Sequence, residues 1–293
     1  MVLTFYIVDV FAETPLTGNP LALVADADGL DETLMQAVAR EFNQSETTFI
    51  LSPTRDGATC RIRSFTPSGT EVFGAGHNAL GAWWWLGTAG KLALDDGYGR
   101  FAQEIGERVL PVEVVGLNGR PSEIWMDQAP PRLGQMVTDL PELAAALGLD
   151  IQNLKDAAQV VSTGAAHLLV PVTNRGVVDR ARPDAVRLAA ILREVEGEGC
   201  YLYSLDVVNQ HSAAYARFFN PTVGIVEDPA TGSAAGPLAS QLVARGVVAD
   251  EKTMIIEQGY AMGRASRIRV TVLGAQVRVG GTGVVVAEGQ LHI

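Results

Sequence analysis

One short pattern occurs twice in the sequence, and it constrains the fold more than any other feature. The segments "AGHNALGAWWWLGTAG" (Ala75–Gly90) and "TGSAAGPLASQLVARG" (Thr231–Gly246) align so that Gly76 corresponds to Gly232. Each copy follows a strand-like segment with a Phe-x-Pro end, "RSFTP" in the first and "RFFNP" in the second. A strand, a tight turn, a glycine and a helix therefore occur in the same order in both halves of the chain. This internal repeat predicts two similar domains.

The chain of 293 residues is long enough for two domains of ordinary size. Gly, Asn and Pro interrupt the pattern at "GLNGRPSE" (Gly116–Glu123), which predicts the domain boundary there. We expect an N-terminal domain of residues 1–118, completed by the last strand at about 281–293, and a C-terminal domain of residues 119–280.

Strand-like segments outnumber helical ones, which favours an α+β fold over a regular βαβ alternation. The segment "NALGAWWWLGTAG" is apolar on every side, a pattern typical of a helix surrounded by protein, and a sheet wrapped around it is the simplest enclosure. The three consecutive tryptophans are expected to fill the core. Helices are predicted after the glycine of each repeat and at Asp31–Glu41, Glu142–Leu147 and Pro183–Glu194.

The charge and composition of the chain argue against nucleic acid, membrane and metal as partners. The formal net charge is −11 and the basic residues are scattered, so a nucleic-acid-binding surface is not predicted. No apolar run has the length of a membrane span, and the N-terminus "MVLTFYIVDVFAETP" has no basic region or cleavage site typical of a signal peptide, so we expect a cytoplasmic protein. Cys60 and Cys200 are far apart and outside any Cys/His cluster, so we expect two buried thiols and no metal site.

The small residues at the start of both repeated helices indicate an anion site. The first N–H groups of a helix have no intrahelical partner, and the helix dipole is positive at that end. In "AGHNA" and "TGSAA" the side chains are small enough for a carboxylate to reach the backbone. If both helix starts face one cleft, they would bind a small carboxylate and stabilise the enolate-like charge that forms when an α-proton leaves.

Four polar side chains are candidates for the chemistry beside this anion site. His77 and Ser233 occupy equivalent positions in the repeat, and Asp228 lies on the loop before the second helix. Glu46 in "NQSETTFIL" precedes a strand, where partial desolvation would raise the pKa of its carboxyl group as a general acid or base requires. Simpler roles stay open: a helix cap for Asp228, a surface histidine, or a solvated glutamate. The remaining members of the predicted site are Ala75, Gly76, Asn78, Thr231 and Gly232, whereas His167, His211 and His292 are interpreted as structural.

The sequence resembles the phenazine-biosynthesis isomerase-like family, whose members are related to diaminopimelate epimerase. The segments that carry the resemblance are, in chain order, "FYIVDVFAETPLTGNPLALV", "NQSETTFI", "RIRSFTP", "GAGHNALG", "STGAAHLLVPV" and "RFFNPTVGIVEDPATGSAAGPLA". The resemblance implies two pseudo-symmetric domains, each a curved, mostly antiparallel sheet around a central helix, with the active site between them, and a homodimer. It further implies that Glu46 moves a proton within the substrate while His77, Asp228 and Ser233 bind it, with no metal or organic cofactor.

Two departures from the family pattern bear on the reaction. Epimerase and racemase relatives carry a cysteine before each helix-starting glycine, where this chain has Ala75 and Thr231, so a two-thiol racemase is excluded. The first motif, "EVFGAGHN", differs from the family pattern E-L-P-F-A-G-H-P at Phe73, Gly74 and Asn78. These differences line the predicted site and leave the substrate unidentified.

The sequence thus predicts a cofactor-independent isomerase that acts on a small carboxylate. A non-catalytic binding protein or scaffold on the same fold, and a lyase that uses the same glutamate, stay open as alternatives.

Overall fold

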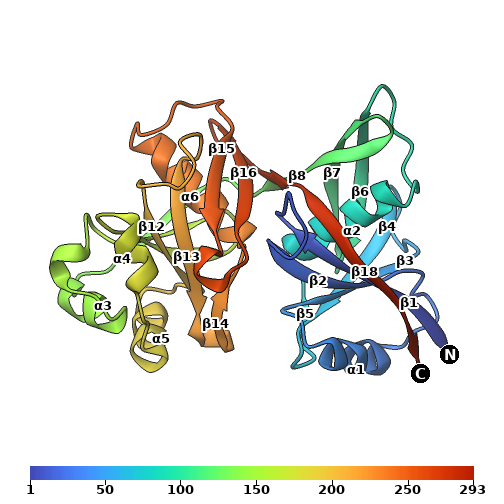
Figure 1. Cartoon of the computed structure of the whole chain (residues 1–293), viewed down its shortest axis with the longest axis horizontal. Coiled ribbons are helices and arrows are strands. Elements are labelled where there is room, and N and C mark those ends of the chain that lie inside the picture. Colours follow the sequence, from blue (N-terminus) through green and yellow to red (C-terminus); the bar gives the residue numbers. More distant parts are fainter. The chain divides into compact units, whose positions relative to one another are not determined.

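The computed structural model describes the whole chain, Met1–Ile293, which divides into two compact units (Figure 1). Unit 1 comprises Met1–Asp127 and Gly280–Ile293, and unit 2 comprises Gln128–Val279. The architecture is a mixed α/β fold with extensive sheet and few helices. The boundary predicted from the sequence falls in the turn before strand β8 (Arg120–Gln128). This strand pairs with β7 (Arg108–Leu117), so contacts assign most of it to unit 1.

In unit 1, strand β1 pairs antiparallel with both β2 and the last strand, β18. The sheet continues through a parallel β2–β3 pair, an antiparallel β3–β4 pair, a parallel β4–β6 pair and the β6–β7 hairpin. Besides β7 and β8, unit 1 contains β1 (Val2–Val10), β2 (Asn19–Val24), α1 (Glu32–Phe42), β3 (Thr47–Leu51), β4 (Cys60–Phe65), β5 (Glu71–Val72), α2 (His77–Thr88), β6 (Tyr98–Ile105) and β18 (Gly283–His292).

Unit 2 contains the same order of pairings. Strand β10 pairs antiparallel with β9 and β11, β11 pairs parallel with β12, β12 pairs antiparallel with β13, β13 pairs parallel with β15, and β15 pairs antiparallel with β16. Its elements are β9 (Arg132–Met136), α3 (Leu140–Ala146), η1 (Ile151–Asn153), β10 (Gln159–Ser162), β11 (Ala166–Pro171), α4 (Arg175–Arg180), α5 (Ala185–Glu194), β12 (Gly199–Ser204), β13 (Ala214–Asn220), η2 (Pro221–Val223), β14 (Ile225–Asp228), α6 (Gly232–Ala244), β15 (Met254–Gln258), η3 (Tyr260–Met262), β16 (Ser266–Leu273) and β17 (Gln276–Gly281).

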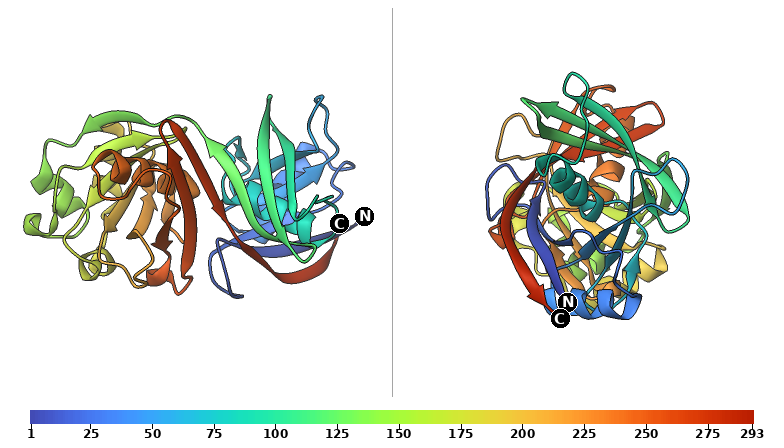
Figure 2. Two further views of the ribbon diagram at one scale, coloured as in Figure 1. Left: turned by 90° about the horizontal axis from the view of Figure 1, so that it is seen from above. Right: turned by 90° about the vertical axis from the view of Figure 1, so that its right-hand side faces the viewer.

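Helix α2 lies inside the sheet of unit 1, where it contacts β1, β2, β3, β4 and β18 (Figure 2, right). All its apolar residues except Trp84 are buried, which agrees with the enclosure predicted from its sequence. The strands approach so closely that a Cβ atom at Gly81 would lie 2.5 Å from Leu21 Cδ2, which explains the glycine. Trp83 and Trp85 are buried, but Trp84, predicted in the core, is only half-buried and packs over Gly283.

Helix α6 is the corresponding element of unit 2, where it contacts β10, β11 and β16. Ten of its thirteen residues are buried. Helices α3, α4 and α5 instead pack against an apolar cluster that includes Leu143, Val178, Leu188 and Phe219.

Several regular elements were not predicted from the sequence, among them β2, β15, the β6–β7 hairpin and α4. The β6–β7 hairpin has many polar residues, and Gly99 and Pro111 interrupt its alternation. Helix α4 has only six residues, too few for a helical period to be recognised. The predicted burial of both thiols is confirmed, and burial raises the pKa of Cys60 and of Cys200 to about 12. No helix combines the length and the apolarity needed to cross a bilayer.

Trp83 offers a test of how tightly helix α2 is enclosed. Its indole N–H donates to Gln103 Oε1 over 2.8 Å, and both side chains are fully buried. Replacing Trp83 with Phe leaves the Gln103 oxygen without this donor, so we expect the free energy of unfolding to fall by about 1–3 kcal/mol. Urea denaturation followed by circular dichroism measures this loss. The double variant Trp83→Phe, Gln103→Leu should recover part of it, and a larger loss in the double variant would contradict the assignment.

Candidate active site

Glu46 immediately precedes strand β3, at the point where the chain has left helix α1. Asn43 ends α1 in the left-handed conformation, with φ 49° and ψ 34°, and so turns the chain away from the helix axis. Strand β3 is paired on both sides, with β2 and with β4. Glu46 is half-buried and lies directly before this firmly held strand.

Ser45, the neighbour of Glu46, contacts His77 at the start of helix α2. Ser45 Oγ lies 3.4 Å from His77 Nε2 and donates its hydrogen to Asn19 Oδ1, also over 3.4 Å. Because that hydrogen is used, we infer that Ser45 accepts from the Nε2–H of His77, which leaves Nδ1 of the imidazole as an acceptor. Desolvation by the surrounding protein lowers the pKa of His77 to about 4, so the ring is neutral near pH 7.

The turn before helix α2 is organised by Asn78. Its Oδ1 accepts from Gly76 N over 2.7 Å, and its Nδ2 donates to Gly74 O over 2.9 Å and to Ser64 Oγ over 3.1 Å. The structure therefore differs from the expectation that Gly76 offers its N–H group to a ligand, because Asn78 already accepts from it. Asn78 is 1% exposed and holds the turn, so its contact with substrate stays a prediction. Ala75 is half-exposed in the same turn.

In unit 2, the loop between β14 and α6 is held by the buried side chain of Gln258. Gln258 Nε2 donates to Asp228 O (2.6 Å) and Thr231 Oγ1 (3.0 Å), and its Oε1 accepts from Thr231 N (3.1 Å) and Tyr201 OH (2.9 Å). Thr231 Oγ1 in turn donates to Asp228 Oδ2. Burial, and then the charge of Asp228, raises the pKa of Tyr201. The Thr231 hydroxyl, expected to bind substrate, thus positions the carboxylate of Asp228 in this structure.

His167, which was interpreted as structural from the sequence, lies on β11 and contacts the predicted site residue Ser233. His167 Nε2 is 3.1 Å from Ser233 Oγ, and its ring meets Phe218 edge-on at 5.1 Å between centroids. The imidazole is 3% exposed, and burial lowers its pKa to about 4. Its Nδ1 has no hydrogen-bond partner in the protein. Because a buried N–H without an acceptor is rare, we infer that the proton sits on Nε2 and is donated to Ser233.

The first turn of helix α6 is fixed by Gln128. Its Nε2 donates to Gly232 O over 3.0 Å, and its Oε1 accepts from Thr163 Oγ1 over 2.6 Å. No side chain caps the N-terminus of either α2 or α6. The first N–H groups of both helices are therefore left for a bound ligand or water.

The nine predicted site residues form two groups, one in each unit. The structure brings Ser45 and His167 into these groups, to His77 and Ser233 respectively. Both lie in segments that carry the family resemblance, the one sequence signal available for them, but their contacts join distant parts of the chain. His211 and His292 are exposed and take no part. No group of three or more His, Cys, Asp or Glu side chains has an arrangement suited to a metal ion.

Comparison with known proteins identifies relatives over the whole chain. The family model PhzC-PhzF, described as phenazine biosynthesis-like protein, matches residues 8–289. An uncharacterised isomerase of Mesorhizobium japonicum is 38% identical, over 99% of this chain and 98% of its own. The trans-2,3-dihydro-3-hydroxyanthranilate isomerase of Pseudomonas aeruginosa is 34% identical, over 99% of both chains.

Among solved structures, the Bacillus anthracis phenazine biosynthesis protein of the PhzF family superposes with a TM-score of 0.90. It is 29% identical, and the match covers 100% of both chains. Sequence and fold therefore agree over the whole length, and the resemblance noted from the sequence motifs is confirmed: this chain belongs to the PhzC-PhzF family of phenazine biosynthesis-like proteins.

Proposed function

We propose that this chain is a cofactor-independent isomerase that moves a proton between two carbon atoms of a small carboxylate. Glu46 is the acid and base of this proposal. The observation that carries it is the placement of Glu46 directly before a strand that is paired on both sides, next to Ser45 and its contact with His77. Family relatives named isomerases, among them one that acts on trans-2,3-dihydro-3-hydroxyanthranilate, support the reaction class.

We further propose that the two units are pseudo-symmetric domains, each a curved sheet around its central helix. The equal order of strand pairings in both units supports this proposal. A homodimer and a cytoplasmic location belong to the same proposal.

Each polar group has a role in this reaction. Glu46 takes a proton from one carbon and returns it to another, so the reaction involves no net oxidation or reduction. His77 accepts a hydrogen bond at Nδ1, and Asp228, held by Thr231 and Gln258, binds a donor group of the substrate. Ser233 donates to the substrate carboxylate together with the first N–H groups of α6. His167 orients that serine and is a positioning residue.

The role of Glu46 is tested by isotope exchange in deuterium oxide. The first compound to assay is trans-2,3-dihydro-3-hydroxyanthranilate, followed by other small cyclic carboxylic acids. Glu46→Gln keeps the size of the side chain but cannot accept the proton, so we expect deuterium incorporation to fall by about 100-fold or more. Glu41→Gln, an exposed glutamate of α1, is the matched control and should leave the rate unchanged. Mass spectrometry of the product measures both.

Three outcomes would redirect the proposal. Undiminished exchange by Glu46→Gln removes Glu46 as the base. A product that has lost a leaving group identifies a lyase. Binding of these acids without exchange, seen as a shift in melting temperature, identifies a non-catalytic binding protein.

A double-mutant cycle tests the pairing of His167 with Ser233. Ser233→Ala removes the proposed donor to the carboxylate, so we expect KM to rise by about three- to tenfold. His167→Leu should raise KM similarly, because without the hydrogen bond from His167 the Ser233 hydrogen is no longer directed toward the substrate carboxylate. The double variant should be no worse than either single variant, and His167→Gln, which keeps an N–H donor, should restore most of the loss. Additive effects, or no rescue by Gln, would show that His167 is only a packing residue.

The low pKa of His167 predicts how stability depends on pH. The unfolded histidine has a pKa near 6.5, whereas the folded pKa is about 4, so the unfolded chain binds the proton more tightly. Lowering the pH from 7 to 5 should therefore reduce the free energy of unfolding, with about 1–2 kcal/mol of the loss due to His167. Urea denaturation at both pH values measures it. In His167→Asn the fall in the free energy of unfolding between pH 7 and pH 5 should be smaller by about 1–2 kcal/mol. A fall equal to that of the unmodified chain would contradict the assignment of His167 as neutral in the folded state.

A further inference from the structure

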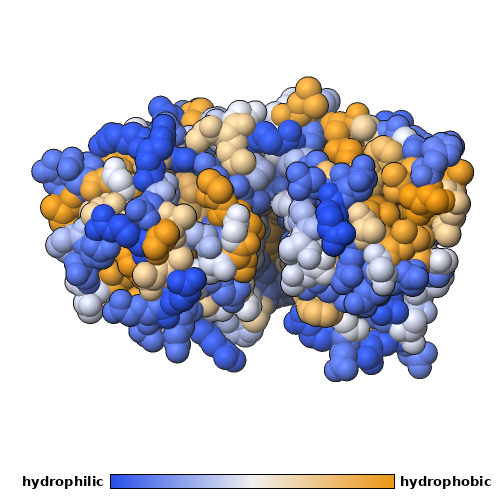
Figure 3. Space-filling model, turned by 90° about the horizontal axis from the view of Figure 1, so that it is seen from below, coloured by the Kyte–Doolittle hydropathy of each residue, from blue (hydrophilic) through white to orange (hydrophobic).

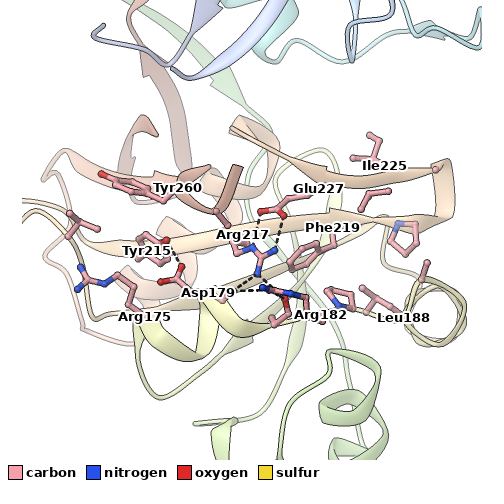
Figure 4. A pocket seen from close by; sticks show the side chains of 18 residues that line it. Arg175, Asp179, Arg182, Leu188, Tyr215, Arg217, Phe219, Ile225, Glu227 and Tyr260 are labelled. Atoms are coloured by element: carbon pink, nitrogen blue, oxygen red, sulfur yellow. Dashed lines mark hydrogen bonds and ion pairs between the residues drawn. The ribbon is translucent and has the colours of Figure 1, made fainter. Parts of the chain in front are cut away.

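Unit 2 contains a pocket that neither the family match nor the proposed reaction uses. Its volume is about 790 Å³, within the range of small-molecule sites. Helices α4 and α5 form one wall, and strands β13 and β14 form the other (Figure 4). Glu227 of β14 lines the pocket, but the next residue, Asp228, does not and instead contacts Thr231. The pocket is therefore distinct from the residues assigned to the reaction.

Two arginines meet at the end of helix α4 inside this pocket. Arg217 Nη1 donates to the carbonyl oxygens of Asp179 (3.2 Å) and Ala181 (3.0 Å). Arg182 Nη1 donates to the same two oxygens, over 3.0 and 2.8 Å. Because the two guanidinium groups share both acceptors, they lie close together, as Figure 4 shows. Like charges at this separation favour an anion between or beside them.

Only one of the two arginines has a carboxylate partner. Arg217 is 5% exposed and forms a two-pronged ion pair with Glu227, with both N–O distances 2.8 Å. Arg182 is exposed and uses only Nη1 in hydrogen bonds with the protein, so Nε and Nη2 remain to bind a ligand. Guanidinium groups bind carboxylates particularly well because they offer parallel N–H donors.

The charged residues that line the pocket also favour an anionic ligand. Three guanidinium groups, of Arg175, Arg182 and Arg217, face two carboxylates, of Asp179 and Glu227. The lining is thus net positive on a chain with a net charge of −11. Anions are repelled from most of the surface but attracted to this pocket.

The rest of the lining is apolar and suits the body of an organic molecule. Leu188 and Phe219 are buried, Ile225 is half-buried, and Arg217 Cζ lies 4.9 Å from the centroid of the Phe219 ring. Val226, which lines the pocket, is exposed, and so are Val186 and Val223, which adjoin the lining residues Ala185 and Gly224 in sequence. Figure 3 shows apolar residues among hydrophilic ones on the half that contains unit 2.

We propose that this pocket binds a small amphipathic anion, an aryl carboxylate or a molecule of similar chemistry, with Arg182 on the carboxylate and the Phe219–Ile225 wall on the ring. The inference is independent of the proposed isomerase activity, because it concerns a different group of residues and is tested by binding alone.

A fluorescent aromatic anion, 8-anilinonaphthalene-1-sulfonate, serves as the probe with the full-length chain. We expect saturable binding that benzoate displaces and that the uncharged isostere benzamide does not. Arg182→Gln should weaken probe binding by about three- to tenfold and reduce its sensitivity to salt. Ile225→Glu places a charge on the apolar wall and should weaken binding by about tenfold or more. Arg193→Gln on α5 removes an equal, exposed charge outside the pocket and should change binding by less than about twofold.

Two results would overturn the proposal, provided circular dichroism shows that each variant is folded. The first is probe binding that persists in both Arg182→Gln and Ile225→Glu, or that benzamide displaces as well as benzoate. The second is a dimer in sedimentation velocity that Ile225→Glu dissociates, with the probe binding only to the monomer. In that case the apolar wall is an interface between two copies of the chain.

Discussion

Two buried helices begin without a side-chain cap, and this constraint governs the arrangement of the residues around them. The N-cap residues of α2 and α6, Gly76 and Thr231, make no capping bond to their own helix. Enclosure by sheet removes most water from the helix but leaves its first N–H groups in need of acceptors. Small residues at both starts keep the backbone accessible, so an anionic ligand satisfies a requirement that the fold itself creates.

Neutral amide side chains, rather than charged ones, hold the loops that lead into these helices. Asn78 and Gln258 each bond to a backbone N–H and a backbone carbonyl at once. An amide has a donor group and an acceptor atom side by side, which explains why one residue is enough to fix each turn. In unit 2 the same amide also fixes Thr231 and, through it, the carboxylate of Asp228.

Local patterns predicted the elements of the fold better than the contacts between them. The apolar helix α2 and the glycine at its start follow from short-range sequence, and so does α1, whose predicted first residue Asp31 is its N-cap. The role of His167 does not follow from short-range sequence, because it depends on β11 passing beside the start of α6, 66 residues later in the chain. The contacts of Gln258 with Asp228 and Thr231 likewise do not follow from short-range sequence. Long-range contacts of single polar residues leave no periodic signal in the sequence.

Each unit has one serine–histidine contact, and the two contacts have opposite hydrogen-bond directions. In unit 1, Ser45 gives its hydrogen to Asn19 and accepts from His77, so the imidazole Nδ1 is left as an acceptor. In unit 2, His167 donates to Ser233, so the serine hydrogen is left as a donor. Both rings are neutral near pH 7 because burial lowers the pKa of each to about 4. The directions therefore do not change over the physiological pH range, so Nδ1 of His77 stays an acceptor and the hydroxyl group of Ser233 stays a donor.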